Sequence, residues 1–219
     1  MAKLGTKPGS NRKGRLVSDH GQEVRNSLSR ADVLTTAMLA GAGVAAGGAL
    51  LGGLADGAAS QPSRKQDVEI LNFGLLLEEL QAAFYADALQ RGSLTGELRQ
   101  FAEQVGAQEE EHADLVRTAL GDDARRLPAF DFGDATGDAK TFGRTARELE
   151  DLGVAAYNTQ APNLTKDALG AAARIVSVEA RHAAWIRDLL GENPAPFASE
   201  PRASAEEVTR ALNRTGFLG

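Results

Sequence analysis

Cysteine is absent from this chain of 219 residues. Its absence excludes disulfides, thiolate metal ligands, iron–sulfur clusters and cysteine nucleophiles, so a bound metal must take oxygen and nitrogen ligands. Tyrosine, tryptophan and histidine are scarce, at two, one and three residues. No stretch alternates apolar and polar residues as a half-buried strand does, and this favours an all-α fold.

Positive charge is scarce after residue 60. Residues 1–60 carry 7 Lys or Arg against 4 Asp or Glu, a net charge of +3, and the remaining residues carry 17 against 26, a net charge of −9. Phosphate backbones are bound by clustered Lys and Arg, so we expect no nucleic-acid partner. The contrast predicts a basic N-terminal extension, 1–60, and a separate domain, 61–219.

The extension contains 19 uncharged residues, 37–55, rich in Ala and Gly, close to the roughly 20 that a helix needs to cross a bilayer. With basic residues before it and small residues at 58–60, the segment resembles an export signal, with Arg30 alone where a twin-arginine signal has a pair. A retained membrane anchor and a Gly/Ala linker in a cytosolic protein are the alternatives. We expect an exported protein of the periplasm or cell envelope, with membrane contact through 37–55 if the segment is retained.

Apolar residues recur at helical spacing in four long segments. These predict helices over 66–90, from the N-cap Thr95 to Leu120, over 140–159 and over 164–190. Residues 121–138 form a connection long enough to cross over along a bundle. Ser204-x-x-Glu207 predicts a capping box and a short last helix. We therefore predict a four-helix bundle with a crossover between its second and third helices.

Two Glu-x-x-His steps lie on the apolar stripes of separate helices, Glu109 with His112 and Glu179 with His182. Residues three apart share a helix face, so each pair can reach one point. A buried carboxylate without a partner is strongly unfavourable, so these residues require a positive charge. The alternatives without a metal are a solvated acidic run and ordinary core histidines. A metal site is favoured because two of the three His in the chain lie in matched Glu-x-x-His motifs.

The first and third helices must supply the remaining carboxylates. Glu78 and Glu150 are our choices, because each has mostly small or apolar neighbours on its face and lies seven residues before one of the two tyrosines, Tyr85 and Tyr157. Glu79 also has apolar neighbours, so the choice between it and Glu78 stays open. The tyrosine hydroxyls are candidate catalytic residues that would orient ligand carboxylates, and core packing is the alternative.

The charges of these residues would balance in a dinuclear metal site. Four Glu carry four negative charges, which two divalent cations cancel while neutral imidazoles complete the ligand sets. The halves also repeat, since Glu78 precedes Glu109 by 31 residues and Glu150 precedes Glu179 by 29. Two such helical pairs would surround two metals with pseudo-two-fold symmetry, as in di-iron and di-manganese carboxylate bundles.

The motifs resemble ferritin-like proteins often called desiccation-related, over roughly residues 66–190. The resemblance is carried by Leu71-Asn72-Phe73, Leu77-Glu78, Ala83-Phe84-Tyr85, Glu109-x-x-His112-Ala113-Asp114, Leu149-Glu150-Asp151, Gly153-Val154-Ala155-Ala156-Tyr157 and Glu179-x-x-His182. The ligand pattern is also similar to bacterioferritin and rubrerythrin.

The resemblance implies a ferritin-like bundle whose metals react with oxygen or peroxide. It implies that Glu109 and Glu179 bridge the metals and that the full ligand set is Glu78, Glu109, His112, Glu150, Glu179 and His182. One departure is Gln81, where relatives are expected to carry a second Glu, and this puts additional metal or proton-transfer roles in doubt.

We therefore expect two Fe ions, with oxidation of Fe(II) or reduction of oxygen or hydrogen peroxide in stress or desiccation protection, in a homo-oligomer. Two Mn ions with catalase-like disproportionation of peroxide are the first alternative, because oxygen and nitrogen ligands suit both metals. A non-enzymatic, metal-sequestering envelope protein is the second.

Overall fold

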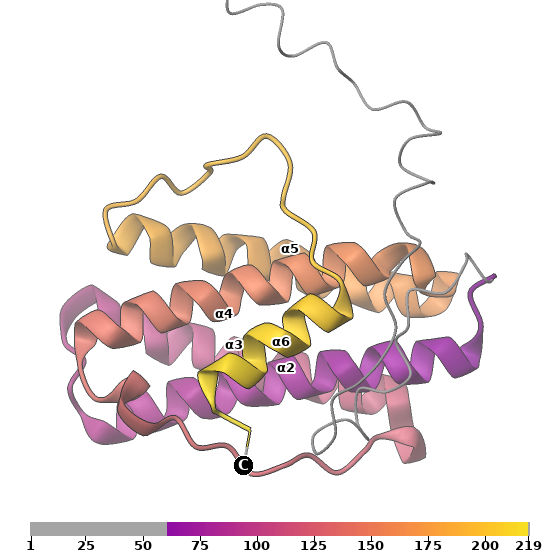
Figure 1. The fold of residues 1–219 in the computed structure, drawn as a ribbon, viewed down its shortest axis with the longest axis horizontal. Helices are drawn as coiled ribbons and strands as arrows, with labels where there is room; N and C mark the ends of the chain where they lie inside the picture. Colours follow the sequence, from indigo (N-terminus) through magenta and orange to yellow (C-terminus); the bar gives the residue numbers. More distant parts are fainter. Residues whose placement is uncertain (1–60, 219) are drawn as a thin grey trace, which may run out of the picture. The chain divides into compact units, whose positions relative to one another are not determined.

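A computed structural model describes residues 61–218 of the chain, with helices labelled as in Figure 1. The signal or anchor expected at residues 37–55 lies outside the described residues, as does the rest of the extension. Within residues 61–218, none of the helices combines the length and the apolar character needed to cross a membrane.

Four long helices form the bundle predicted from the sequence (Figure 1). Each begins and ends within two residues of its predicted bounds. α2 and α3 form one hairpin, α4 and α5 form the other, and a short helix, α6, packs against α4. The bounds are α2 Arg64–Arg91, α3 Gly96–Leu120, α4 Ala139–Gln160, α5 Lys166–Leu189 and α6 Ala205–Thr215.

Polar side chains fix where several helices begin. The Ser63 hydroxyl accepts a hydrogen bond from the backbone of α2, and Asp138 accepts two from the first turn of α4. The capping box predicted for Ser204 and Glu207 is present at α6. Thr95 precedes α3 as predicted, but its side chain makes no capping hydrogen bond. These caps satisfy backbone N–H groups that have no partner within the helix.

The predicted crossover is confirmed. Residues 121–138 run along the length of the bundle, so that α3 and α4 point in the same direction (Figure 1). Asn72 on α2 anchors the start of this connection, because its Nδ2 donates to the Asp123 carbonyl at 3.0 Å and its Oδ1 accepts from the Arg125 backbone at 2.7 Å. Near the far end, the Thr136 hydroxyl donates to Asp87.

Two apolar clusters occupy the bundle interior. One is rich in aromatic side chains and includes Phe84, Phe101 and Phe142. The other is mainly aliphatic and includes Leu75 and Ile175. Along each long helix, the buried glutamate lies between residues of the two clusters. The acidic layer is therefore closed from both sides by packed hydrocarbon.

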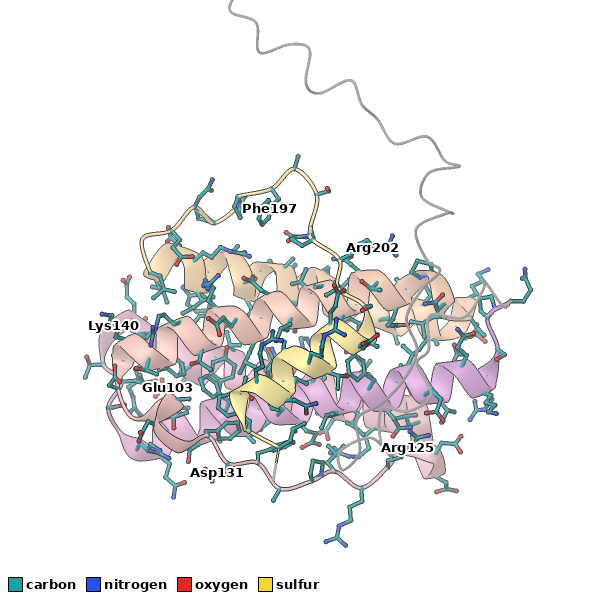
Figure 2. All side chains as sticks on the ribbon, in the orientation of Figure 1. Glu103, Arg125, Asp131, Lys140, Phe197 and Arg202 are labelled. Carbon is teal, nitrogen blue, oxygen red and sulfur yellow. The ribbon has the colours of Figure 1, made fainter. Side chains whose placement is uncertain are left out.

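Phe84 at the centre of the aromatic cluster is fully buried, with its ring 5.3 Å from Phe142 and 5.5 Å from Phe132. We expect Phe84→Ala to lower the free energy of unfolding by about 3–5 kcal/mol, because it leaves a cavity where large rings meet. Phe197 is 57% exposed on the loop after α5 (Figure 2), and Phe197→Ala should change stability by less than about 0.5 kcal/mol. Urea unfolding measures both, and similar losses would contradict this description of the core.

Candidate metal centre

Each of the four long helices places one glutamate at the same level of the bundle interior. Glu109, Glu150 and Glu179 are 0% exposed and Glu78 is 1% exposed. His112 and His182, one turn after Glu109 and Glu179, are also buried. Because residues three apart share a helix face, both Glu-x-x-His steps turn the same way, into the bundle.

These side chains form two overlapping groups. Within each group one ligand atom per residue lies within 4.8 Å of the others. Glu109 and Glu179 belong to both groups, which is the placement expected of bridging carboxylates. The first group is completed by Glu78 and His112, and the second by Glu150 and His182.

The imidazoles face the carboxylates through the same ring nitrogen. His112 Nδ1 lies 3.3 Å from Glu78 Oε2 and 3.1 Å from Glu179 Oε1. His182 Nδ1 lies 3.0 Å from Glu109 Oε1 and 3.4 Å from Glu150 Oε2. Glu109 directs one oxygen to each histidine, because its Oε2 lies 3.3 Å from His112 Nδ1.

Several inward-facing atoms are buried and have no hydrogen-bond partner. They are Glu78 Oε2, Glu109 Oε1, Glu150 Oε2, both oxygens of Glu179 and His182 Nδ1. Buried polar groups are normally hydrogen-bonded, so a concentration of unpartnered acceptors at one point indicates a ligand. Carboxylate oxygens and imidazole nitrogens are ligands that Fe, Mn and related divalent ions accept. These residues therefore fit a pair of divalent cations, whose charge would balance the four carboxylates.

In the metal-free protein, bound protons offset part of the negative charge of the carboxylates. Burial, and then the charge of Glu150, raises the pKa of Glu109 well above its ordinary value. Burial, and then the charge of Glu109, does the same to the pKa of Glu179. Burial alone would lower the pKa of His112, but the close approach of Glu109, Glu179 and Glu78 to its ring outweighs this and raises that pKa to about 12.

The two tyrosines contact the carboxylates across the hairpins. Tyr85 on α2 donates to Glu150 Oε1 on α4 at 2.5 Å, and Tyr157 on α4 donates to Glu78 Oε1 on α2. Burial, followed by the neighbouring glutamate, raises the pKa of each phenol well above its ordinary value, so both hydroxyls remain protonated donors. They are placed to orient the carboxylates, and a catalytic role for them stays a prediction.

The structure separates Glu78, which the sequence favoured, from its alternative Glu79. Glu78 joins the buried group, whereas Glu79 points out of the bundle and forms an ion pair with Arg117 on α3.

Two glutamines complete the surroundings of the site. Gln81 donates to Glu150 Oε1 at 3.1 Å, and Gln108 Oε1 lies 2.6 Å from His182 Nε2. Sequence reasoning noticed Gln81 only as a departure from the family pattern and missed Gln108 altogether. Gln108 immediately precedes a ligand on its helix, and helical spacing gives no sign that its side chain reaches the neighbouring helix.

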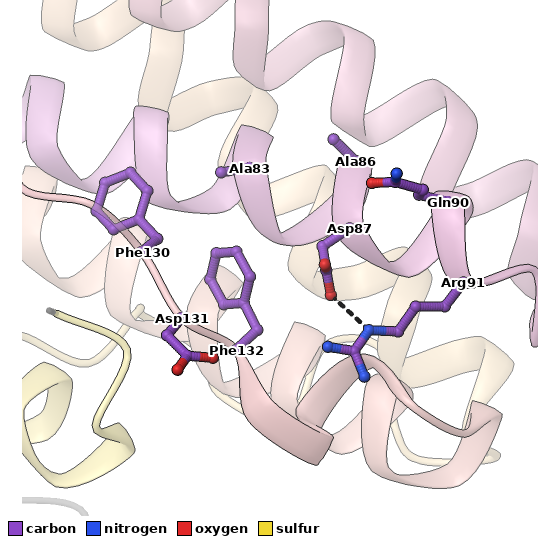
Figure 3. A pocket seen from close by; sticks show the side chains of 8 residues that line it. All are labelled: Ala83, Ala86, Asp87, Gln90, Arg91, Phe130, Asp131 and Phe132. Carbon is purple, nitrogen blue, oxygen red and sulfur yellow. Dashed lines mark hydrogen bonds and ion pairs between the residues drawn. The ribbon is translucent and has the colours of Figure 1, made fainter.

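A surface pocket lies between α2 and the crossover (Figure 3). Two of its charged residues satisfy each other, because Arg91 Nε donates to Asp87 Oδ2 at 2.9 Å, and the Thr136 hydroxyl donates to the same oxygen. The third, Asp131, accepts from the Gly133 backbone at 3.0 Å. This pocket therefore lacks the unpartnered ligand atoms that gather inside the bundle.

Comparison with known proteins agrees with this geometry. A family model described as a ferritin-like domain matches residues 66–192. This range includes the buried glutamate of each long helix, together with His112 and His182. Among curated proteins, none matches the chain.

We expect the melting temperature of the metal-free protein to fall as the pH rises from about 5 to about 8. Glu109, Glu179 and His112 all have raised pKa values when folded. Each contribution to stability is fully present below the ordinary pKa, 4.5 for Glu and 6.5 for His, and is lost as the pH rises toward the folded pKa. Calorimetry on metal-free protein measures the slope.

The same scan on protein loaded with Mn(II) should be flatter, because the cations replace the protons. The double variant Glu109→Gln, Glu179→Gln should also be flatter without metal. A melting temperature that rises over this pH range in the metal-free protein would contradict the assignment.

Proposed function

Because this chain belongs to the ferritin-like domain family, we propose that it is a di-iron carboxylate protein that oxidises Fe(II) or reduces oxygen or hydrogen peroxide. The observation that carries the proposal is the pair of overlapping ligand groups joined by Glu109 and Glu179. Two cations held by shared carboxylates would lie close together. Closely spaced metal pairs are suited to reactions that neither metal performs alone.

In this proposal each residue has a role set by its place around the two metal positions. Glu78 with His112 would hold one metal, Glu150 with His182 would hold the other, and the shared glutamates, Glu109 and Glu179, would contribute to both. Iron bound there would supply the electrons that reduce the oxidant. Tyr85 and Tyr157 hold the outer carboxylates by their Oε1 atoms, which leaves the unpartnered Oε2 atoms free to face the metals.

The surroundings of the site support redox chemistry in three ways. The apolar clusters on both sides keep bulk water away from the reacting atoms. The carboxylates release protons when cations enter, and these groups can take protons up again when charge at the centre changes. The buried phenols remain hydrogen-bond donors throughout, because their pKa values lie above the working range.

The test is metal stoichiometry followed by oxidation. The full chain, made metal-free and loaded anaerobically with Fe(II), should bind two ions and develop near-ultraviolet absorbance when air or peroxide is added. Glu109→Gln should bind fewer than two Fe(II) ions per chain and should oxidise Fe(II) at least about tenfold more slowly, because a shared ligand is lost. Glu110→Gln is the matched control, since the neighbouring side chain is exposed and both measurements should stay unchanged.

Other outcomes would select the alternatives. Manganese in protein purified without added metal, together with oxygen release from peroxide, would favour the di-manganese enzyme. Tight binding of two ions without any oxidation would favour metal sequestration. Failure to bind divalent ions would contradict all three.

We further propose that the protein acts outside the cytoplasm, in protection against oxidative stress or drying. Support comes from the sequence of the extension, residues 37–60, and from the family resemblance. Mass spectrometry of the N-terminus of protein from its native cells tests the location. Cleavage near residue 60 would indicate an exported form, whereas an intact N-terminus in membrane fractions would indicate an anchor.

A further inference from the structure

The two halves of the metal centre are related by position in the sequence. A shift of 72 residues carries Glu78 to Glu150 and Tyr85 to Tyr157, and a shift of 70 carries Glu109 to Glu179 and His112 to His182. All six proposed ligands and both tyrosines therefore obey the pseudo-two-fold symmetry.

Two residues next to the site break this symmetry. The shift of 72 carries Gln81 to Gly153, and the shift of 70 carries Gln108 to Val178. In each case an amide in the first half is matched by a residue whose side chain can neither donate nor accept a hydrogen bond. The ligands are symmetric, but the groups that hold them are not.

Both amides serve the same metal position, the one held by Glu150 and His182. Gln81 Nε2 and the Tyr85 hydroxyl both donate to Glu150 Oε1, at 3.1 Å and 2.5 Å, which fixes the rotation of this carboxylate. His182 Nε2 donates to Gln108 Oε1 at 2.6 Å. In a neutral imidazole, a proton held on Nε2 by Gln108 leaves the lone pair on Nδ1, the buried atom that faces the carboxylates.

The other position, held by Glu78 and His112, lacks both contacts. Glu78 Oε1 accepts a hydrogen bond from Tyr157 alone. Within residues 61–218 no side chain hydrogen-bonds His112 Nε2, and the His112 side chain is 10% exposed, against 3% for His182. Among the described residues, no protein group therefore holds the outer nitrogen of this imidazole, as Gln108 holds that of His182.

The glycine in this pair leaves room for the carboxylate of Glu179. A Cβ at Gly153 would lie 2.7 Å from Glu179 Oε2, closer than real Cβ contacts allow. A side chain at this position that could repeat the role of Gln81 would therefore displace the Glu179 carboxylate. The close packing of Gly153 on α4 against Glu179 on α5 therefore accounts for the missing amide in the second half.

We infer that Gln81 and Gln108 are positioning residues that make the Glu150/His182 position the tighter of the two, so that it fills first and the Glu78/His112 position exchanges its metal. Partners of this kind contribute about 10–100-fold to metal affinity. The inference rests on the proposed dinuclear site and adds an order of loading to it. It does not depend on which reaction the loaded site performs.

The test is an anaerobic titration of the metal-free full chain with Co(II), followed by calorimetry and visible absorption. We expect two steps whose affinities differ by about 10–100-fold. His112→Ala should keep the tight step, and His182→Ala should lose it. The reverse assignment, or two equal steps in the unaltered protein, would overturn the inference.

Variants of the glutamines provide the second readout. Gln108→Leu should weaken the tight step at least about tenfold and leave the weak step unchanged, whereas Gln108→Glu, which can still accept from His182, should restore it. Gln81→Met should weaken the same step. The matched control is Val178→Leu, at the symmetry-related, half-buried position, which should change neither step.

Proton NMR of the protein with one equivalent of Co(II) shows whether Gln108 acts by holding the imidazole. One hyperfine-shifted, exchangeable imidazole N–H signal should be present and should disappear in Gln108→Leu. Equal weakening of both steps by this variant would contradict the inference while leaving the proposed function intact. Absence of any Co(II) binding would contradict the proposed function itself.

Discussion

Repulsion among four buried carboxylates is the constraint on which the rest of this structure depends. Glu78, Glu109, Glu150 and Glu179 come from four different helices and meet where packed hydrocarbon excludes water. Charges in such surroundings lose their hydration and repel one another strongly. Protons on the shared glutamates and on His112 relieve this in the metal-free protein, and two divalent cations would relieve it more completely. Without nearby positive charge these four carboxylates would destabilise the fold, whereas with protons or cations beside them they can be accommodated in the interior.

The helix arrangement makes the convergence possible. The crossover sets α3 and α4 parallel, so that the two hairpins face each other with their glutamates at one level. Tyr85 and Tyr157 then join the halves, since each donates to the glutamate of the opposite hairpin. Neither hairpin contains a complete ligand group, because every group takes residues from both. Each ligand group is therefore complete only when the two hairpins are packed together.

Symmetry in the ligands coexists with asymmetry in what holds them. A repeat of one helical hairpin accounts for the matched glutamates, histidines and tyrosines. Two amides on one side and a glycine and a valine on the other make the two metal positions chemically different. The proposed dinuclear site would then retain one metal while exchanging the second, which would suit the proposed oxidation of Fe(II).

Sequence alone determined the fold class, the four long helices and five of the six converging side chains, with Glu79 left open as an alternative to Glu78. It could do so because helical periodicity and three-residue spacing are local properties, and because polar residues within an apolar stripe stand out. The choice of Glu78 over Glu79 needed the structure, since both have apolar neighbours along the chain and only the position of Arg117 on α3 shows which one turns outward. The crossed tyrosine contacts and the reach of Gln108 to His182 were also decided only by tertiary structure. These contacts join different helices, and their geometry depends on how the helices pack rather than on the spacing within any one of them.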